Sequence, residues 1–365
     1  MNNSLEMARK IINEVDRDMA ELFVKRMRAA ELVAEYKQRH GLKILDEARE
    51  AEVVRRNSEY VEAPELKPYY VNFIKDVMAV SRSYQDKLIS GMRVAFCGTE
   101  GAYAHIATEK LFPTARKVAY PNFESAYRSV EVGDCDIVVL PIENSSNGEV
   151  GEVTDLMFSG GLYISGVCEL AISHDLLCVP GARIEDIKTV ISHQQALGQC
   201  VTYINEHGFN TQAYANTALA AKHVMELGDK SVAAIASAEA AEIFGLDVLD
   251  KNINQSRSNT TRFAVFTRAE NIHKSTEMGV HTILLFTVRN EAGALARAID
   301  IIGKHGFNMR SLRSRPMKEL LWQYYFYVEA EGNIYTEDGQ RMMAELDKYC
   351  DRLKSVGTFK KADTN

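Results

Sequence analysis

Glycine is nearly absent from the first quarter of the chain. Residues 1–90 contain one glycine, Gly41, whereas the other 21 lie in the remaining 275 residues. The same 90 residues carry 16 lysines and arginines and 16 aspartates and glutamates. Few glycines and dense, balanced charge are typical of long, partly solvated helices. We therefore predict an all-helical domain over residues 1–90.

Beyond Gly91 the pattern changes. Short runs rich in β-branched residues alternate with helical stretches as far as residue 270, which predicts an α/β domain with a parallel or mixed sheet. A polar stretch at 271–278 predicts a second boundary. Residues 279–360 follow the order strand, helix, strand, strand, helix, strand, which is that of a ferredoxin-like α+β domain.

Composition and charge argue against several classes of partner. The formal net charge is −7, so the chain has no overall basic field for nucleic acid. No apolar stretch approaches the roughly 20 residues that a membrane-spanning helix needs, and the N-terminus lacks the pattern of a secretory signal. Six cysteines without C-x-x-C spacing indicate reduced thiols and no metal site. We expect a cytoplasmic protein with neither nucleic-acid nor membrane partners.

An apolar stripe with heptad-like spacing runs from Leu5 to Tyr36 and predicts a long amphipathic helix. Arg26 interrupts this stripe, and a buried guanidinium is costly unless an anion meets it. Lys37 lies 11 residues further on, about 20° from Arg26 around the helix. Arg9 lies 17 residues before Arg26 and about 100° away. The face that carries Arg26 and Lys37 is therefore predicted to bind an anion.

Polar residues of two further helices extend this set. A second helix is predicted to begin at Asp46, a good N-cap residue, with Arg49 and Glu50 in its first turn. On a third helix, Ser81 and Gln85 lie four residues apart beside an apolar stripe. Each residue by itself would usually be solvated, but their combination points to a site.

Together these eight residues closely resemble the polar set of the all-helical chorismate mutase family, over nearly the whole of residues 4–89. The resemblance implies an intertwined homodimer in which Arg9 serves the site of the partner chain. It implies that Arg26 and the partner's Arg9 bind the carboxylates of chorismate, and that Lys37 and Gln85 donate to its ether oxygen. Glu50, with Asp46, would accept from the ring hydroxyl, while Arg49 and Ser81 would order the rim.

Four segments of the α/β domain place polar or glycine-rich turns beside predicted strands. They are residues 96–105 (FCGTEGAYAH), 139–148 (VLPIENSSNG), 191–200 (ISHQQALGQC) and 259–263 (NTTRF). Ligands of open α/β sheets bind at the ends of strands, and a glycine-rich turn before a helix presents backbone N–H groups to an anion. Each segment alone is weak evidence of function, and we expect His193 to be structural.

In this order, the four segments resemble the prephenate dehydratase family across about residues 92–268, most specifically at 141–145 (PIENS) and 261–263 (TRF). The resemblance implies two α/β lobes around a cleft, similar to a periplasmic binding protein, with a hinge formed by 162–173 and 254–266. It implies that Thr261 supplies the acidic contact to the departing hydroxyl of prephenate. Arg262 is either a carboxylate anchor or a hinge ion pair. The implied pocket residues are Glu143, Asn144, Ser192 and Gln199.

The C-terminal domain joins a strand to a helix at 290–297 and ends a strand at 311–316. This layout resembles the ACT regulatory domain of dehydratases, which binds phenylalanine at a dimer interface. The implied effector residues are Gly293, Ala294, Leu295, Ser314, Arg315 and Pro316. Arg313 stands where that family usually has a glutamate. The alternative is a plain ferredoxin-like dimerisation domain.

These resemblances predict a bifunctional enzyme of phenylalanine biosynthesis. It would rearrange chorismate to prephenate, convert prephenate to phenylpyruvate, and be inhibited by phenylalanine. No metal or redox cofactor is implied, because neither step needs one. Three alternatives remain: a dehydratase with an inactive mutase domain, a dehydratase that acts on arogenate, and a non-catalytic amino-acid sensor.

Overall fold

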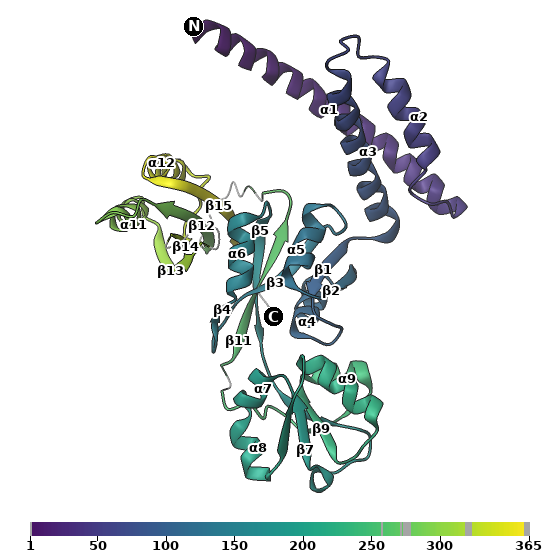
Figure 1. The fold of residues 1–365 in the computed structure, drawn as a ribbon, viewed down its shortest axis with the longest axis vertical. Helices are drawn as coiled ribbons and strands as arrows, with labels where there is room; N and C mark the ends of the chain where they lie inside the picture. The colour runs from purple at the N-terminus through teal and green to yellow at the C-terminus, as the bar shows by residue number, and fades with distance from the viewer. Residues whose placement is uncertain (1, 257, 271, 273–278, 318–322, 361–365) are drawn as a thin grey trace. The chain divides into compact units, whose positions relative to one another are not determined.

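The computed structural model describes residues 2–256, 258–270, 272, 279–317 and 323–360. The chain divides into two compact units, Met1–Arg93 and Val94–Asn365 (Figure 1). The boundary predicted at 271–278 lies, apart from residue 272, outside the described residues.

The first unit is all-helical, as predicted. Its helices are α1 (Asn2–His40), α2 (Glu47–Ser58) and α3 (Lys67–Ser90). The carboxylate of Asp46 caps α2 by accepting from the backbone N–H of Arg49 at 3.0 Å. The core is small and consists mainly of Ala30, Ala34 and Met78. The apolar stripe of the N-terminal part of α1, which includes Leu5, Ile12, Val15, Met19 and Leu22, is exposed in the single chain.

The second unit contains a lobe built on a six-stranded mixed sheet. Its order is β2-β1-β3-β11-β5, with β4 paired to β3. The strands are β1 (Arg93–Cys97), β2 (Arg116–Tyr120), β3 (Ile137–Asn144), β4 (Gly148–Glu149), β5 (Tyr163–Ala171) and β11 (Thr260–Thr267). Its helices are α4 (Tyr103–Leu111), α5 (Phe123–Glu131) and α6 (Gly151–Ser159). Strand β11 runs antiparallel to both β3 and β5.

A second lobe is built on a five-stranded sheet of order β10-β6-β9-β7-β8. Its strands are β6 (Asp175–Cys178), β7 (Thr189–Ser192), β8 (Asn210–Ala213), β9 (Val232–Ala236) and β10 (Asp247–Asp250). Its helices are η1 (Ile184–Asp186), α7 (Gln194–Gln199), α8 (Val201–His207), α9 (Thr217–Leu227) and α10 (Ala238–Phe244). The apolar side chains of this lobe form a core of their own.

The chain crosses between the two lobes twice, after β5 and before β11. Both crossings fall at the edges of the two segments predicted as the hinge. They are short, at 172–174 and 251–259, because most of each predicted segment pairs within the first sheet as β5 or β11. The prediction of two α/β lobes is confirmed.

The C-terminal part of this unit has the predicted order of elements. They are β12 (Val280–Val288), α11 (Ala294–Lys304), β13 (Asn308–Pro316), β14 (Tyr324–Glu331), α12 (Glu337–Leu346) and β15 (Cys350–Lys360). The four strands form an antiparallel sheet of order β13-β14-β12-β15. One face packs with α11 and α12. The other face shares a core with the first lobe, in which Val356 and Phe359 join Ile164 and Phe266.

The close approach of β15 to β5 requires glycine at position 357. Its φ is +149°, and a Cβ there would lie 2.3 Å from the carbonyl oxygen of Ile164. We expect Gly357→Ala to lower the free energy of unfolding by about 3 kcal/mol, through backbone strain and overpacking. Urea unfolding followed by circular dichroism measures this. Gly166→Ala, on β5 itself, is the control because nothing lies within 4 Å of its Cβ position. Equal losses in the two variants would contradict the packing argument.

Candidate active sites

In the helical unit, the two cations on the α1 seam turn inward. A guanidinium nitrogen of Arg26 contacts the hydroxyl of Ser81 on α3 and the carbonyl of Val77 at 3.3 Å. The ammonium of Lys37 contacts the carbonyl of Ile44, just before α2. Both side chains are half-buried, and burial lowers the pKa of Arg26. Arg26 and Lys37 are therefore held at the inner face of the three helices.

Gln85 is the most distinctive residue of this face. It lies one turn after Ser81 on α3 and is only 8% exposed. Its side-chain oxygen is buried and has no hydrogen-bond partner among the residues that the structure describes. Leaving a buried polar atom unpaired costs about 1–3 kcal/mol. Such a group in a native protein is a candidate ligand contact.

The other predicted residues of this unit lie at its edge. Glu50 is half-buried and pairs with Arg82 of α3, a partner that the sequence analysis missed because the contact is long-range. Arg49 is exposed and pairs with Glu52 at 2.6 Å. Arg9 is exposed on the N-terminal part of α1, about 25 Å along the helix from Arg26. A single chain therefore does not bring Arg9 to the site of Arg26.

The second unit has a cleft of about 520 Å³ between its two lobes. Asn144 at the end of β3 and Thr261 at the start of β11 line it from the first lobe, and Gln199 lines it from the second. These three were predicted. The first residues of α4, α5 and α9 with the loops before them, the loop before α6, and residues of α7 form much of the remaining wall.

Asn144 fixes the orientation of Thr261. The side-chain oxygen of Asn144 accepts from the backbone N–H groups of Ser146 and Asn147, both at 3.0 Å. Its amide nitrogen must therefore donate, and it does so to the Thr261 hydroxyl at 3.0 Å and to the side-chain oxygen of Asn259 at 2.9 Å. Because the Thr261 oxygen accepts from Asn144, its own proton is available to a ligand.

The hydrogen bonds continue across the cleft through residues that the sequence analysis did not single out. Asn259 donates to the side-chain oxygen of Gln199 at 3.1 Å, and Nε2 of His174 lies 2.8 Å from the same oxygen. Burial lowers the pKa of His174. Asn259 is the first residue of the 259–263 segment, and His174 lies in the first crossing, one residue beyond the predicted hinge. Those positions are the only sequence signals that could have indicated them.

Two of the predicted lining residues lie elsewhere. Glu143 points away from the cleft, because side chains alternate along a strand and Asn144 takes the cleft side. Its carboxylate pairs with Arg262 at 3.0 Å and with Arg313 of β13. Ser192 is fully buried and donates to the carbonyl of Ile235 at 2.6 Å, which ties β7 to β9 within the second lobe. Neither side chain lines the cleft.

Arg262 is also turned to the C-terminal sheet. Its two terminal nitrogens bind the Glu329 carboxylate of β14 at 2.7 and 2.8 Å. Glu329 is almost completely buried, and despite that burial the pKa of its carboxyl is lowered by the hydrogen bonds and charge of Arg262. Arg262 is thus an ion-pair residue, but the pair joins the first lobe to the C-terminal sheet and does not lie at the hinge.

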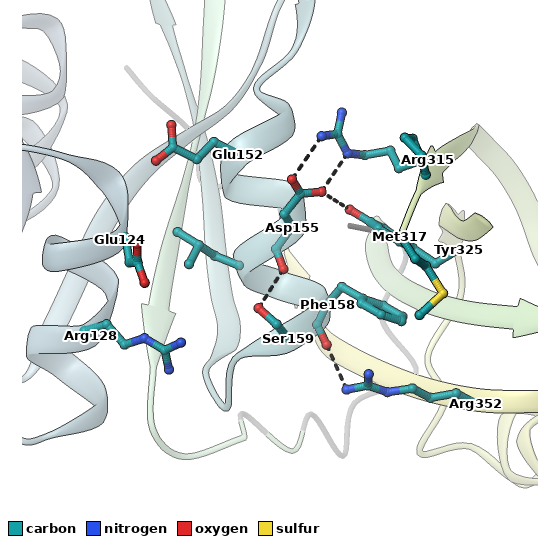
Figure 2. A pocket seen from close by; sticks show the side chains of 12 residues that line it. Glu124, Arg128, Glu152, Asp155, Phe158, Ser159, Arg315, Met317, Tyr325 and Arg352 are labelled. Carbon is teal, nitrogen blue, oxygen red and sulfur yellow. Dashed lines mark hydrogen bonds and ion pairs between the residues drawn. The ribbon is translucent and has the colours of Figure 1, made fainter. Parts of the chain in front are cut away.

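The predicted effector residues fall in two places. Gly293 caps α11 in the left-handed conformation (φ +81°), followed by buried Ala294 and half-buried Leu295. Ser314, Arg315 and Pro316 lie on the edge strand β13. Arg315 reaches the first lobe, where it binds Asp155 of α6 at 2.9 Å (Figure 2). It also binds Glu149 of β4 at 2.7 Å. No hydrogen bond or ion pair between described residues joins the two places.

Comparisons with known proteins cover both units. Residues 8–86 match the model of chorismate mutase type II, and residues 94–271 match that of prephenate dehydratase. A bifunctional chorismate mutase/prephenate dehydratase from Neisseria gonorrhoeae is 30% identical over 354 residues, which are 96% of this chain and 95% of the relative.

Other relatives lack a counterpart to part of the chain. Arogenate dehydratase/prephenate dehydratase 1 of Arabidopsis thaliana is 34% identical over 74% of this chain and 72% of its own length. The crystal structure of prephenate dehydratase from Arthrobacter aurescens in complex with L-Phe is similar with a TM-score of 0.70 and 26% identity, over 75% of this chain and 92% of that one. In the described part of the chain, no helix is long and apolar enough to cross a membrane.

The near-complete coverage of a two-domain relative, together with a match to each domain's family, shows that the chain belongs to the family of bifunctional chorismate mutase/prephenate dehydratases.

Proposed function

We propose that residues 1–90 rearrange chorismate to prephenate, that the cleft within residues 91–270 converts prephenate to phenylpyruvate, and that residues 279–360 form an ACT domain that binds phenylalanine. The observation that carries the proposal is the meeting of Asn144 and Thr261 in the cleft, in a chain whose first 90 residues hold Arg26 and Lys37 at a buried face. The enzyme would act in the cytoplasm.

The mutase step needs charge placement and no nucleophile. Chorismate is a dicarboxylate whose rearrangement is concerted, so the site must hold a compact conformer and stabilise negative charge on the breaking ether oxygen. Arg26 would bind a carboxylate, while Lys37 and Gln85 would donate to the ether oxygen. The contact of Arg26 with Ser81 and the burial of Gln85 one turn further along α3 support these roles.

A homodimer would complete this site. The N-terminal part of α1 exposes a stripe of apolar residues that includes Leu5, Ile12 and Leu22, each more than half exposed. A stripe of this kind is stable in water only when another helix covers it. A second copy packed along it would bring the partner subunit's Arg9 to the site that contains Arg26.

Mixing two inactive variants tests both the site and the dimer. Arg26→Ala and Arg9→Ala should each lower the mutase kcat/KM by about 100- to 1000-fold, the usual cost of one preorganised donor. When the two are co-expressed, about a quarter of the sites should regain both arginines, because half of the dimers are mixed and each mixed dimer has one intact site. Coupled assays of chorismate consumption measure the recovery.

Arg17→Ala is the matched control, since this cation of α1 is exposed and has no role in the proposed site. Full mutase activity in Arg26→Ala would refute the role of Arg26, and a wild-type chain without mutase activity would support an inactive mutase domain. No recovery on mixing would contradict the shared site.

The dehydratase step needs an acidic contact at the departing hydroxyl. Prephenate loses carbon dioxide, the electrons of that bond enter the ring, and the hydroxyl leaves as water after gaining a proton. The Thr261 proton, left free by the bond from Asn144, would hydrogen-bond to the hydroxyl as it departs. A threonine is a weak acid, so it helps only through a bond that strengthens in the transition state.

Thr261→Ala should therefore lower the dehydratase kcat by about 100- to 1000-fold and change KM little. Thr261→Ser keeps the hydroxyl and should retain most activity. Thr260→Ala is the matched control, because the neighbouring hydroxyl is directed to the Ser258 carbonyl at 3.4 Å and does not line the cleft. Phenylpyruvate formation measures all three, and offering arogenate beside prephenate gives the substrate preference. Unchanged turnover in Thr261→Ala would refute its role, and a wild-type chain that binds prephenate without turnover would be a sensor.

Phenylalanine would inhibit the dehydratase through β13. The Arthrobacter relative was crystallised with L-Phe, and β13 carries Ser314, Arg315 and Pro316. Arg315 binds Glu149, which lines the cleft. It also binds Asp155, which accepts from Tyr325 at 2.7 Å (Figure 2). A shift of β13 on effector binding would thus move a wall of the dehydratase site.

We expect millimolar phenylalanine to reduce prephenate turnover, and Arg315→Met to raise the half-inhibitory concentration by about tenfold, a typical allosteric coupling. Arg310→Met is the control, because Arg310 lies on the same strand but pairs with Glu331 of the neighbouring strand. Dose–response curves of phenylpyruvate formation give both values. A turnover rate that phenylalanine leaves unchanged would refute the regulatory proposal.

A further inference from the structure

The described lining of the interlobe cleft contains neither lysine nor arginine. Its titratable groups are Cys97, Tyr103, Glu149, His174 and His193. Arg262, which adjoins Thr261, faces the opposite side of the sheet. A ligand with two carboxylates would therefore meet hydroxyl, amide and imidazole groups there. Bringing a dianion into a partly enclosed site is costly unless positive charge accompanies it.

Both ring nitrogens of His174 face hydrogen-bond acceptors. On the Nε2 side the acceptor is the side-chain oxygen of Gln199, whose orientation is fixed because Asn259 also donates to it. Two backbone N–H groups, which can only donate, fix the side-chain oxygen of Asn144. The amide nitrogen of Asn144 then donates to the oxygen of Asn259, which leaves the nitrogen of Asn259 to donate to Gln199. Nε2 therefore carries a proton.

On the Nδ1 side the acceptor is the hydroxyl oxygen of Tyr103, 3.1 Å away. The same hydroxyl contacts the Ser173 carbonyl, and a carbonyl can only accept, so the Tyr103 proton lies on that bond. Burial raises the pKa of Tyr103 well above its usual value, so the hydroxyl keeps this proton. A neutral His174 then leaves Nδ1 facing a lone pair, whereas a proton on Nδ1 satisfies every member of the chain.

Opposing influences act on the pKa of His174. Burial lowers its pKa, which makes the ring neutral near pH 7 in the free enzyme. The hydrogen bond to Gln199 and the charge of Asp175, its neighbour on β6, act in the opposite direction. The negative charge of a bound dicarboxylate would also raise the pKa of His174.

We propose that His174 takes up a proton when the dicarboxylate substrate enters the cleft, and so becomes the cation of the described lining. This inference rests on the proposed dehydratase function. His174 is a positioning residue: its ring contacts Gln199 and Tyr103, and it acts on the substrate through its charge and through the amide of Gln199.

Calorimetric titration measures the proton directly. Prephenate is titrated at pH 7.5 into the full chain carrying Thr261→Ala, which is expected to bind without turnover, in phosphate and in Tris. The observed enthalpy changes with the ionisation enthalpy of the buffer in proportion to the protons taken up. We expect close to one proton per site, and close to none when His174→Gln is added. The described lining of the cleft holds no lysine or arginine that could take up this proton.

Two further variants separate the possible causes. His193→Gln removes the other imidazole of the cleft and should leave the proton uptake intact. Tyr103→Phe keeps the His174 ring but removes the acceptor at Nδ1, so the uptake should fall, and this variant serves if His174→Gln does not fold. In the enzyme with Thr261, kcat/KM should decline as the pH rises above the pKa of free His174, and this decline should be absent in His174→Gln.

Binding of prephenate with no proton uptake, or uptake that persists in His174→Gln, overturns the inference alone. Failure of the wild-type chain to form phenylpyruvate, or failure of the Thr261→Ala chain to bind prephenate, overturns the proposed function and this inference with it.

Discussion

The antiparallel pairing of β3 with β11 is the contact on which the rest of the second unit depends. It sets Asn144 opposite Thr261 and Glu143 opposite Arg262, from segments more than 100 residues apart. Because successive side chains on a strand point to opposite faces, the first pair enters the cleft and the second meets the C-terminal sheet. One stretch of ladder therefore supports both the proposed chemistry and the attachment of the C-terminal domain.

That attachment is made of charge as well as apolar surface. Glu329 is buried and would be unstable there without Arg262, since breaking a buried ion pair leaves an uncompensated charge that costs about 3–5 kcal/mol. Arg313 and Arg315 of β13 reach Glu143 and Glu149 in the same region. The guanidinium of Arg313 also lies over the ring of Tyr327. The positive charge of Arg313 thus pairs with Glu143 of the first lobe.

The helical unit presents the opposite situation, a structure that a single chain leaves incomplete. The inner face formed by α1 and α3 is closed around Ala30, Ala34 and Met78, whereas the apolar stripe of the N-terminal part of α1 is exposed. The apolar residues of the long helix are therefore only partly buried within one chain. The proposed dimer follows from the hydrophobic effect, because covering that stripe removes apolar area from water.

The sequence by itself determined the type and order of the elements, and its resemblance to prephenate dehydratases implied that Asn144, Gln199 and Thr261 belong to the cleft. Periodicity, glycine usage and strand-end position are local properties, and they can be read without knowing what packs against what. Only the tertiary structure decided which face of β3 and β11 meets the cleft. Polar residues occupy both faces there, so the alternation of the sequence does not distinguish Glu143 from Asn144 or Arg262 from Thr261.

The tertiary structure also decided the positions of Ser192 and His174. The hydroxyl of Ser192 donates to the Ile235 carbonyl of a neighbouring strand, and the partners of His174 come from α4 and α7. Hydrogen bonds between distant segments fixed the direction of each of these side chains, and a local sequence pattern carries no information about such partners.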